Sequence, residues 1–110
     1  MERRTNLRGR LEFPVMEREG GFSYWCTALD VSPTGIRIDR GGEVLARDRQ
    51  SLVQLELHLP DLGEPLRVLA TTVWSNGTLQ GLRFVGLDDA DRLTLAEQLD
   101  LLQHRGGDLN

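Results

Sequence analysis

The feature of this sequence that most constrains its fold is an alternation of apolar and polar side chains with a period of two. It is clearest at residues 53–59, VQLELHL, where every second residue is valine or leucine. Successive side chains of a β-strand point to opposite faces, so a segment of this kind buries one face and exposes the other. The segment is therefore predicted to be a half-buried β-strand.

Five further segments are also predicted to be strands: residues 11–15, 22–31, 36–39, 66–74 and 79–85. Turn-forming residues separate them, namely Gly20-Gly21, Gly41-Gly42, the stretch 60–65 and Ser75-Asn76-Gly77. Asn-Gly between two strand patterns is a strong signal for a β-hairpin. Several short strands at this spacing favour a small sandwich or barrel, and we expect a mostly antiparallel barrel.

The end of the chain has a helical period instead. Leu95, Leu99 and Leu102 recur at the spacing of one helix face, supported by Leu93 and Ala96. Asp88 or Asp89 is expected to cap the start of a helix over residues 89–104, and Gly106-Gly107 to stop it. The prediction is a barrel closed by a C-terminal α-helix.

The length of 110 residues corresponds to one domain. Cys26 is the only cysteine, which excludes an internal disulfide and a cysteine-rich zinc site. No apolar run approaches the roughly 18 residues that span a bilayer, and no apolar stretch follows the basic N-terminus, as a secretory signal would require. These observations predict a cytoplasmic protein that does not enter a membrane.

Positive charge is concentrated at the N-terminus. The net charge is −4, yet Arg3, Arg4, Arg8 and Arg10 fall within the first ten residues, with Glu2 as the only acid among them. An acidic protein with a compact cationic site is suited to a small anion and disfavours long polyanions. Direct binding of DNA or RNA is therefore not expected.

Two motifs stand apart from the strand pattern. Arg3-Arg4-Thr5-Asn6-Leu7-Arg8 precedes the first strand, and Asp30-Val31-Ser32-Pro33-Thr34-Gly35 lies between the second and third. In this order and on this layout they resemble the signature of the PilZ family. The segment 70–74 followed by Gly81-Leu82-Arg83-Phe84 looks like that family's closing hairpin, so the resemblance extends to about His104. Ile36 departs from it, since a second glycine often stands there.

The resemblance implies a six-stranded antiparallel β-barrel of the PilZ-like split-barrel type with a C-terminal helix, in a bacterial receptor for cyclic di-GMP. The implied ligand-binding residues are Arg3, Arg4, Arg8, Asp30, Ser32 and Gly35. The chemistry agrees, because guanidinium fits phosphate and the O6 and N7 acceptors of guanine. A carboxylate can accept from guanine N1–H and N2–H, and glycine allows a positive φ and close approach of a base.

Three other residues leave alternatives open. Arg37 follows the second motif and is a further candidate ligand contact, or is simply exposed on a strand. Trp74 could stack on a guanine, as could Trp25, but each lies in an alternating strand, and core packing is favoured for both.

The expected organisation is a flexible arginine arm (residues 1–9), a barrel with its helix (10–105) and a frayed tail (106–110). The leading functional hypothesis is that ligand binding orders the arm and transmits the messenger level to a protein partner, which the sequence does not identify. A ligand-independent protein-interaction module of the same fold is the alternative. A small nucleic-acid-binding barrel is a third reading, disfavoured by the acidic balance.

The sequence does not support catalysis, a cofactor or a metal site. It contains no P-loop, GxSxG or HExxH string. His58 and His104 lie far apart among polar neighbours, and Cys26 alternates with Tyr24 and Ala28 as a small core residue does. We expect a binding protein rather than an enzyme.

Overall fold

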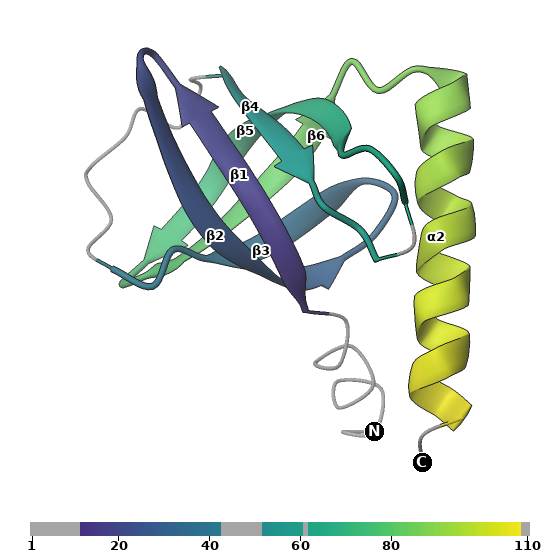
Figure 1. Cartoon of the computed structure of the whole chain (residues 1–110). Helices are drawn as coiled ribbons and strands as arrows, with labels where there is room; N and C mark the ends of the chain where they lie inside the picture. Colours follow the sequence, from purple (N-terminus) through teal and green to yellow (C-terminus); the bar gives the residue numbers. More distant parts are fainter. Residues whose placement is uncertain (1–11, 43–51, 61, 109–110) are drawn as a thin grey trace.

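The computed structural model describes residues 12–42, 52–60 and 62–108, and it contains six strands and a long helix (Figure 1). The strands are β1 (Phe13–Glu19), β2 (Phe22–Val31), β3 (Gly35–Asp39), β4 (Leu52–Leu57), β5 (Leu66–Asn76) and β6 (Leu79–Val85), and the helix is α2 (Asp89–Asp108). Each of the six predicted strands is present. The alternation of side chains therefore located every strand of the described chain.

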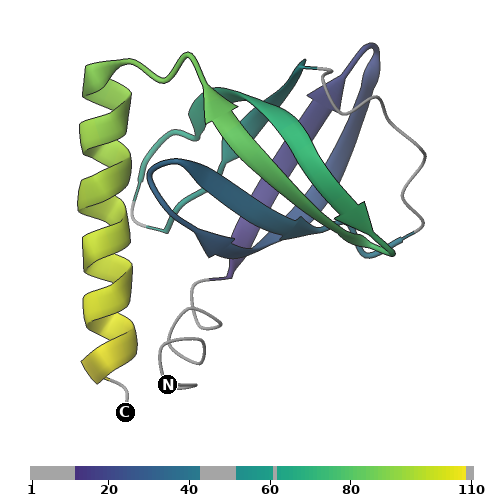
Figure 2. The same cartoon turned by 180° about the vertical axis from the view of Figure 1, so that it is seen from behind.

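The strands close into a barrel in the order β1-β2-β3-β6-β5-β4, and every neighbouring pair is antiparallel (Figure 2). Consecutive strands are neighbours except where the chain passes from β3 to β4. The Asn-Gly hairpin joins β5 to β6, with Gly77 at a φ of 64°. This closed six-stranded antiparallel barrel with one C-terminal helix confirms the predicted fold class.

The core lies inside the barrel and under the helix. Val15, Ile38, Leu55 and Ala70 are fully buried on strands β1, β3, β4 and β5. Cys26, predicted to be a core residue, is 5% exposed and contributes to the same core. The apolar side chains of the alternating segments therefore face this core, as inferred from the sequence.

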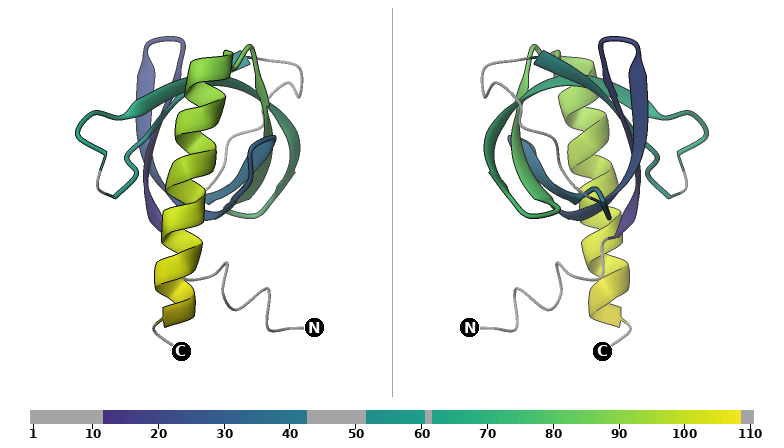
Figure 3. Two further views of the ribbon diagram at one scale, coloured as in Figure 1. Left: turned by 90° about the vertical axis from the view of Figure 1, so that its right-hand side faces the viewer. Right: turned by 90° about the vertical axis from the view of Figure 1, so that its left-hand side faces the viewer.

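Helix α2 lies beside the barrel and, seen from its own side, crosses in front of the ring of strands (Figure 3). Leu95, Leu99 and Leu102 are buried in the barrel core, as predicted. Leu93, expected to support this face, is instead 61% exposed. Asp88 caps the helix, because its Oδ1 accepts a hydrogen bond of 2.8 Å from the backbone N–H of Asp91.

The predicted stop of this helix at Gly106-Gly107 is wrong, since α2 continues through both glycines to Asp108. Glycine lowers helix stability, but unlike proline it keeps its backbone N–H donor. A glycine therefore ends a helix when it adopts the left-handed conformation of a C-cap, and otherwise it can remain within the helix.

Two strand pairs contain a shift of register. One lies between β2 and β3, at Ala28 and Asp30, and the other between β5 and β6, at Thr72 and Trp74. A β-bulge places two residues opposite one and re-aims the side chains that follow it. The pairs β1–β2, β1–β4, β4–β5 and β3–β6 keep one register throughout.

The expectation that Trp25 packs in the core is wrong, because its side chain is 58% exposed. Strand β2 places Cys26 and Ala28 inside the barrel, so the alternating position of Trp25 faces outward. The outward indole contacts the His58 ring, with 5.1 Å between the ring centroids.

Candidate functional site

A pocket of about 400 Å³ opens on the outside of the barrel, over strands β2, β3, β5 and β6. Ten residues from both halves of the described chain line it: Asp30, Val31, Ser32, Gly35, Ile36, Arg37, Val73, Trp74, Gly81 and Leu82. The three described residues of the predicted binding floor therefore lie in one cavity. Both further candidates, Arg37 and Trp74, line the same cavity.

Four of these residues form a continuous row of cross-strand partners. Asp30 on β2 pairs with Arg37 on β3, Arg37 pairs with Gly81 on β6, and Gly81 pairs with Trp74 on β5. Neighbouring strands lie about 4.8 Å apart, so the row spans about 14 Å across the barrel surface. An acid, a base, a bare backbone and an aromatic ring thus follow one another on a surface the size of a small ligand.

The two bulges explain why the ends of this row face outward. Strict alternation from the buried Ala28 would put Asp30 inside the barrel, but the bulge places Val31 inside and leaves Asp30 half-buried at the pocket. In β5, alternation from the buried Thr72 would put Trp74 inside. The bulge leaves Trp74 38% exposed, so the prediction that it packs in the core is also wrong.

Ser32 organises the turn between β2 and β3. Its Oγ accepts a hydrogen bond of 3.2 Å from the backbone N–H of Thr34 and lies 3.1 Å from the Thr34 hydroxyl. Its own N–H donates to the Gly35 carbonyl at 2.9 Å. This is the self-bonded turn that serine commonly forms. Ser32 remains exposed, and its side chain lies at the edge of the pocket.

Gly35 is required for a reason other than the positive φ that was predicted for it. It is not among the described glycines with a positive φ. Instead, a Cβ at this position would lie 2.6 Å from the Leu82 carbonyl oxygen, closer than real Cβ contacts. The absence of a side chain therefore lets the start of β3 approach the backbone of β6. The predicted positive φ at Gly35 is therefore wrong, and the close approach of a base to this glycine stays a prediction.

Gly81 is a pocket residue that sequence reasoning did not predict as functional. The indole of Trp74 occupies the space where a side chain at position 81 would lie, since a Cβ there would be 2.8 Å from Trp74 Cδ1 and closer still to Nε1 and Cε2. Gly81 is consequently buried although it belongs to the outer face of β6. The only signal in the sequence was a glycine inside a strand pattern, which often marks close approach.

Arg3, Arg4 and Arg8 lie outside the described residues, as does the whole of the predicted arm, residues 1–9. Their assignment as ligand-binding residues stays a prediction. Among the described residues, Arg37 is an exposed cation of the pocket lining.

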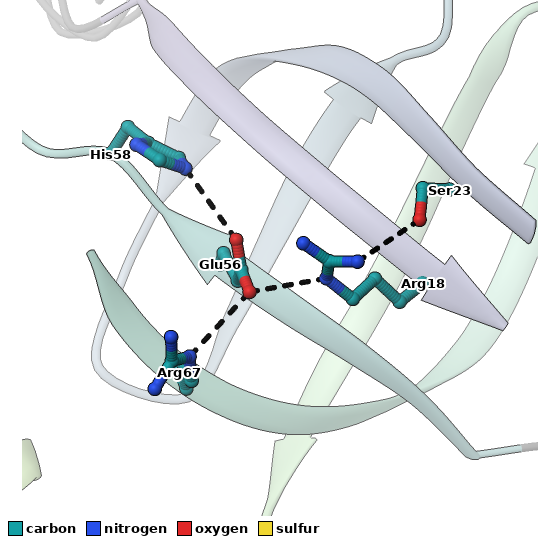
Figure 4. Close-up of polar contacts among 5 residues, drawn as sticks. All are labelled: Arg18, Ser23, Glu56, His58 and Arg67. Carbon is teal, nitrogen blue, oxygen red and sulfur yellow. Dashed lines mark hydrogen bonds and ion pairs between the residues drawn. The ribbon is translucent and has the colours of Figure 1, made fainter.

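A second polar group, the Glu56 cluster (Arg18, Ser23, Glu56, His58 and Arg67), lies elsewhere on the barrel surface (Figure 4). Glu56 Oε2 is 3.1 Å from Arg18 Nε and 3.5 Å from Arg67 Nε, and Glu56 Oε1 is 3.8 Å from His58 Nε2. The hydrogen bond from Arg18 is the main cause that lowers the pKa of Glu56. The charges of Arg18 and Arg67 act in the same direction, and desolvation opposes them.

A third charged group lies within the barrel. Glu17 is fully buried, and its Oε1 is 3.5 Å from Arg40 Nε and 3.8 Å from the Cys26 sulfur. The Arg40 guanidinium also lies 4.2 Å from the centroid of the Tyr24 ring. A buried carboxylate is tolerated when it is paired in this way, so this group serves the fold of the barrel.

The pocket therefore offers hydrogen-bond acceptors, a cation and an aromatic ring, which together suit recognition of a nitrogenous base and its phosphate. Among the described residues, no group of three or more His, Cys, Asp or Glu side chains is placed to hold a metal ion. The described helix is not long and apolar enough to cross a membrane.

Comparison with known proteins identifies a family whose model matches this chain. The family model of the PilZ domain matches residues 2–101. Among solved structures, the crystal structure of an uncharacterized Legionella protein is similar, with 12% identity and a TM-score of 0.48 over 87% of this chain and 90% of that one. A search of curated proteins found no match.

Proposed function

The chain belongs to the PilZ domain family, and from that premise we propose that it is a receptor for cyclic di-GMP, the ligand that the family signature implies. The observation that carries the proposal is the pocket itself. It brings Asp30, Ser32 and Gly35 together with Arg37, further along β3, and with Trp74 from β5. PilZ domains are binding modules, and the pocket is suited to holding a ligand.

In the proposed complex, the row of cross-strand partners receives one guanine and its phosphate. The Asp30 carboxylate accepts from guanine N1–H and N2–H, a donor pattern that adenine lacks. Arg37, its partner on β3, offers a planar fork of donors to a phosphate or to the O6 and N7 edge. Trp74, at the far end of the row, presents a ring on which a base stacks.

The arginine motif supplies the remaining charge in this proposal. Arg3, Arg4 and Arg8 neutralise the two phosphates and grip the guanine edges, and binding orders the arm over the pocket. Charge-assisted hydrogen bonds contribute about 1.5–3 kcal/mol each, so several of them are compatible with a micromolar dissociation constant, about −8 kcal/mol. The ordered arm changes the surface shown to a protein partner in the bacterial cytoplasm.

Titration calorimetry with cyclic di-GMP tests the proposal, with GTP and cyclic di-AMP as specificity controls. Replacing Arg4 and Arg8 together by alanine is expected to abolish the binding heat, because the phosphates lose their bidentate partners. Circular dichroism should show an unchanged barrel, since both residues precede β1. Absence of heat with the unmodified protein at excess ligand would refute the receptor proposal. A partner captured equally with and without the nucleotide would favour the ligand-independent interaction module.

A further inference from the structure

The contact between Gly81 and Trp74 is closer than any side chain at position 81 would allow. Ring atoms Nε1, Cε2 and Cδ1 of Trp74 all fall within 3.0 Å of the point where a Cβ would stand, and real Cβ atoms do not show such distances. These three atoms belong to the pyrrole part of the indole. That part of the ring is therefore seated against the bare backbone of β6.

Trp74 is not buried by this contact. Trp74 is 38% exposed and lines the pocket together with Val73, the residue at the adjacent bulge. The bulge sets the direction of the side chain and Gly81 supplies its seat, so two independent features of the backbone fix one ring. A ring held in place before binding loses less conformational freedom on binding than a mobile one.

We propose that Gly81 is a positioning residue that holds Trp74 as a stacking platform for one base of the ligand, an inference that rests on the proposed function. The seated ring presents its free part toward the cavity. On the other side of Gly81, its partner Arg37 lies on β3, two strands from Trp74 and about 10 Å away along the row. A purine on the indole has its polar edge within reach of that long side chain.

The proposal predicts a specific dependence between two positions. Loss of a stacking ring weakens nucleotide binding by about 5- to 150-fold. Gly81→Ala inserts a Cβ into the space of the ring and forces it off its seat. Because the ring is partly exposed, it can swing toward solvent while the strands keep their pairing. The substitution should then weaken binding through Trp74 alone.

A double-mutant cycle measured by titration calorimetry with cyclic di-GMP tests this dependence. Trp74→Ala is expected to weaken binding at least about 5-fold, and Gly81→Ala about as much. In the Trp74→Ala background, Gly81→Ala should change the dissociation constant less than about 2-fold, because coupled sites are not additive. Equal losses from Gly81→Ala in both backgrounds, or no loss in either, would overturn the inference. Gly21→Ala, which meets no atom within 4 Å, is the matched control and should bind normally.

Fluorescence separates this inference from the proposed function. The chain has two tryptophans, and Trp25 lies outside the pocket lining, so Trp25→Phe leaves Trp74 as the sole indole. Its emission should change on addition of cyclic di-GMP, and Gly81→Ala in this background should shift the unliganded emission to longer wavelength. Binding heat without an emission change would refute the platform while the receptor assignment stands. Absence of both would refute the receptor assignment.

Discussion

Two rows of outward-facing residues on the same barrel contain similar side chains and differ in what those side chains do. The pocket row runs Asp30, Arg37, Gly81, Trp74 across β2, β3, β6 and β5. The second row, on the opposite arc, runs Arg67, Glu56, Met16, Trp25 across β5, β4, β1 and β2. Each contains an acid paired with an arginine, and each ends in a tryptophan.

The rows differ in register and in one residue. The second row crosses strand pairs without a register shift, and its third member is methionine where the pocket row has glycine. Glu56 is 9% exposed and lies 3.1 to 3.8 Å from Arg18, Arg67 and His58, whereas Asp30 is half-buried at an open cavity. Two bulges and a glycine thus leave room for a cavity on one face. On the other face, regular strand pairing brings polar and charged side chains into contact with Glu56. We infer that the pocket row serves binding and the second row serves stability.

The largest expected effect is that substitutions of the two acids change different properties, ligand binding for Asp30 and thermal stability for Glu56. Asp30→Ala should weaken cyclic di-GMP binding by about 100-fold or more, because two hydrogen bonds of a carboxylate are lost, each about 1.5–3 kcal/mol. The melting temperature of this variant should fall less than that of the Glu56 variant. Glu56→Ala should lower the melting temperature, since it removes the shared partner of Arg18 and Arg67, and should leave the dissociation constant within about twofold.

Calorimetric titration and thermal unfolding of both variants measure these two effects. The control is Asp100→Ala, because Asp100 is an exposed acid on α2. The division of roles between the rows would be disproved by a Glu56 variant that loses binding or an Asp30 variant that chiefly loses stability.

A smaller effect is expected at the paired arginines. Arg37→Ala should weaken binding about 10-fold, the size of one charge-assisted hydrogen bond of about 1.5 kcal/mol. Arg67→Ala removes an equal charge from the same barrel at a residue outside the pocket lining, and should change binding less than twofold. Titration at two salt concentrations measures both. Equal weakening by the two substitutions would mean that Arg37 acts only through long-range electrostatic attraction of the ligand and not through a contact in the pocket.

The smallest expected effect is a pH dependence confined to the second row. The pKa of Glu56 is lowered in the folded protein from its usual 4.5, chiefly by the hydrogen bond from Arg18. A carboxyl with a lowered pKa stabilises the fold above the unfolded value of about 4.5, and the contribution is lost as pH falls through the folded pKa. Below pH 4.5 the melting temperature should therefore fall less steeply in Glu56→Gln than in the unmodified protein. If the melting temperatures of the two proteins fall equally between pH 7 and pH 3, the prediction is contradicted.

The regular parts of the molecule were predictable from the sequence and the bulged parts were not. A period of two located the strands, because burial of one face is its direct cause, and Asn76-Gly77 located the hairpin. The same period misplaced Trp74, since one extra residue at a bulge leaves no mark on composition and reverses every side chain beyond it.

Other errors have separate physical causes. Trp25 could have been placed correctly, because the buried position of Cys26 fixes its neighbour outward. The contacts of Gly35 and Gly81 join strands that are distant in the sequence, so only the folded backbone reveals which atoms a side chain would meet. The motif at 30–35 predicted which residues line the cavity, but the row that completes the site depends on cross-strand pairing.

Closure of the barrel also limits how this domain can be recognised. Each of the six described strands is hydrogen-bonded to a neighbour on both sides over part of its length, so none of them leaves a whole edge unpaired. A partner therefore finds no complete strand edge on which to add a strand of its own, which is a common way for one protein to capture another. Association with the described part of the barrel is therefore expected to use side chains and the shape of its surface, and edge-to-edge self-association is disfavoured for the same reason.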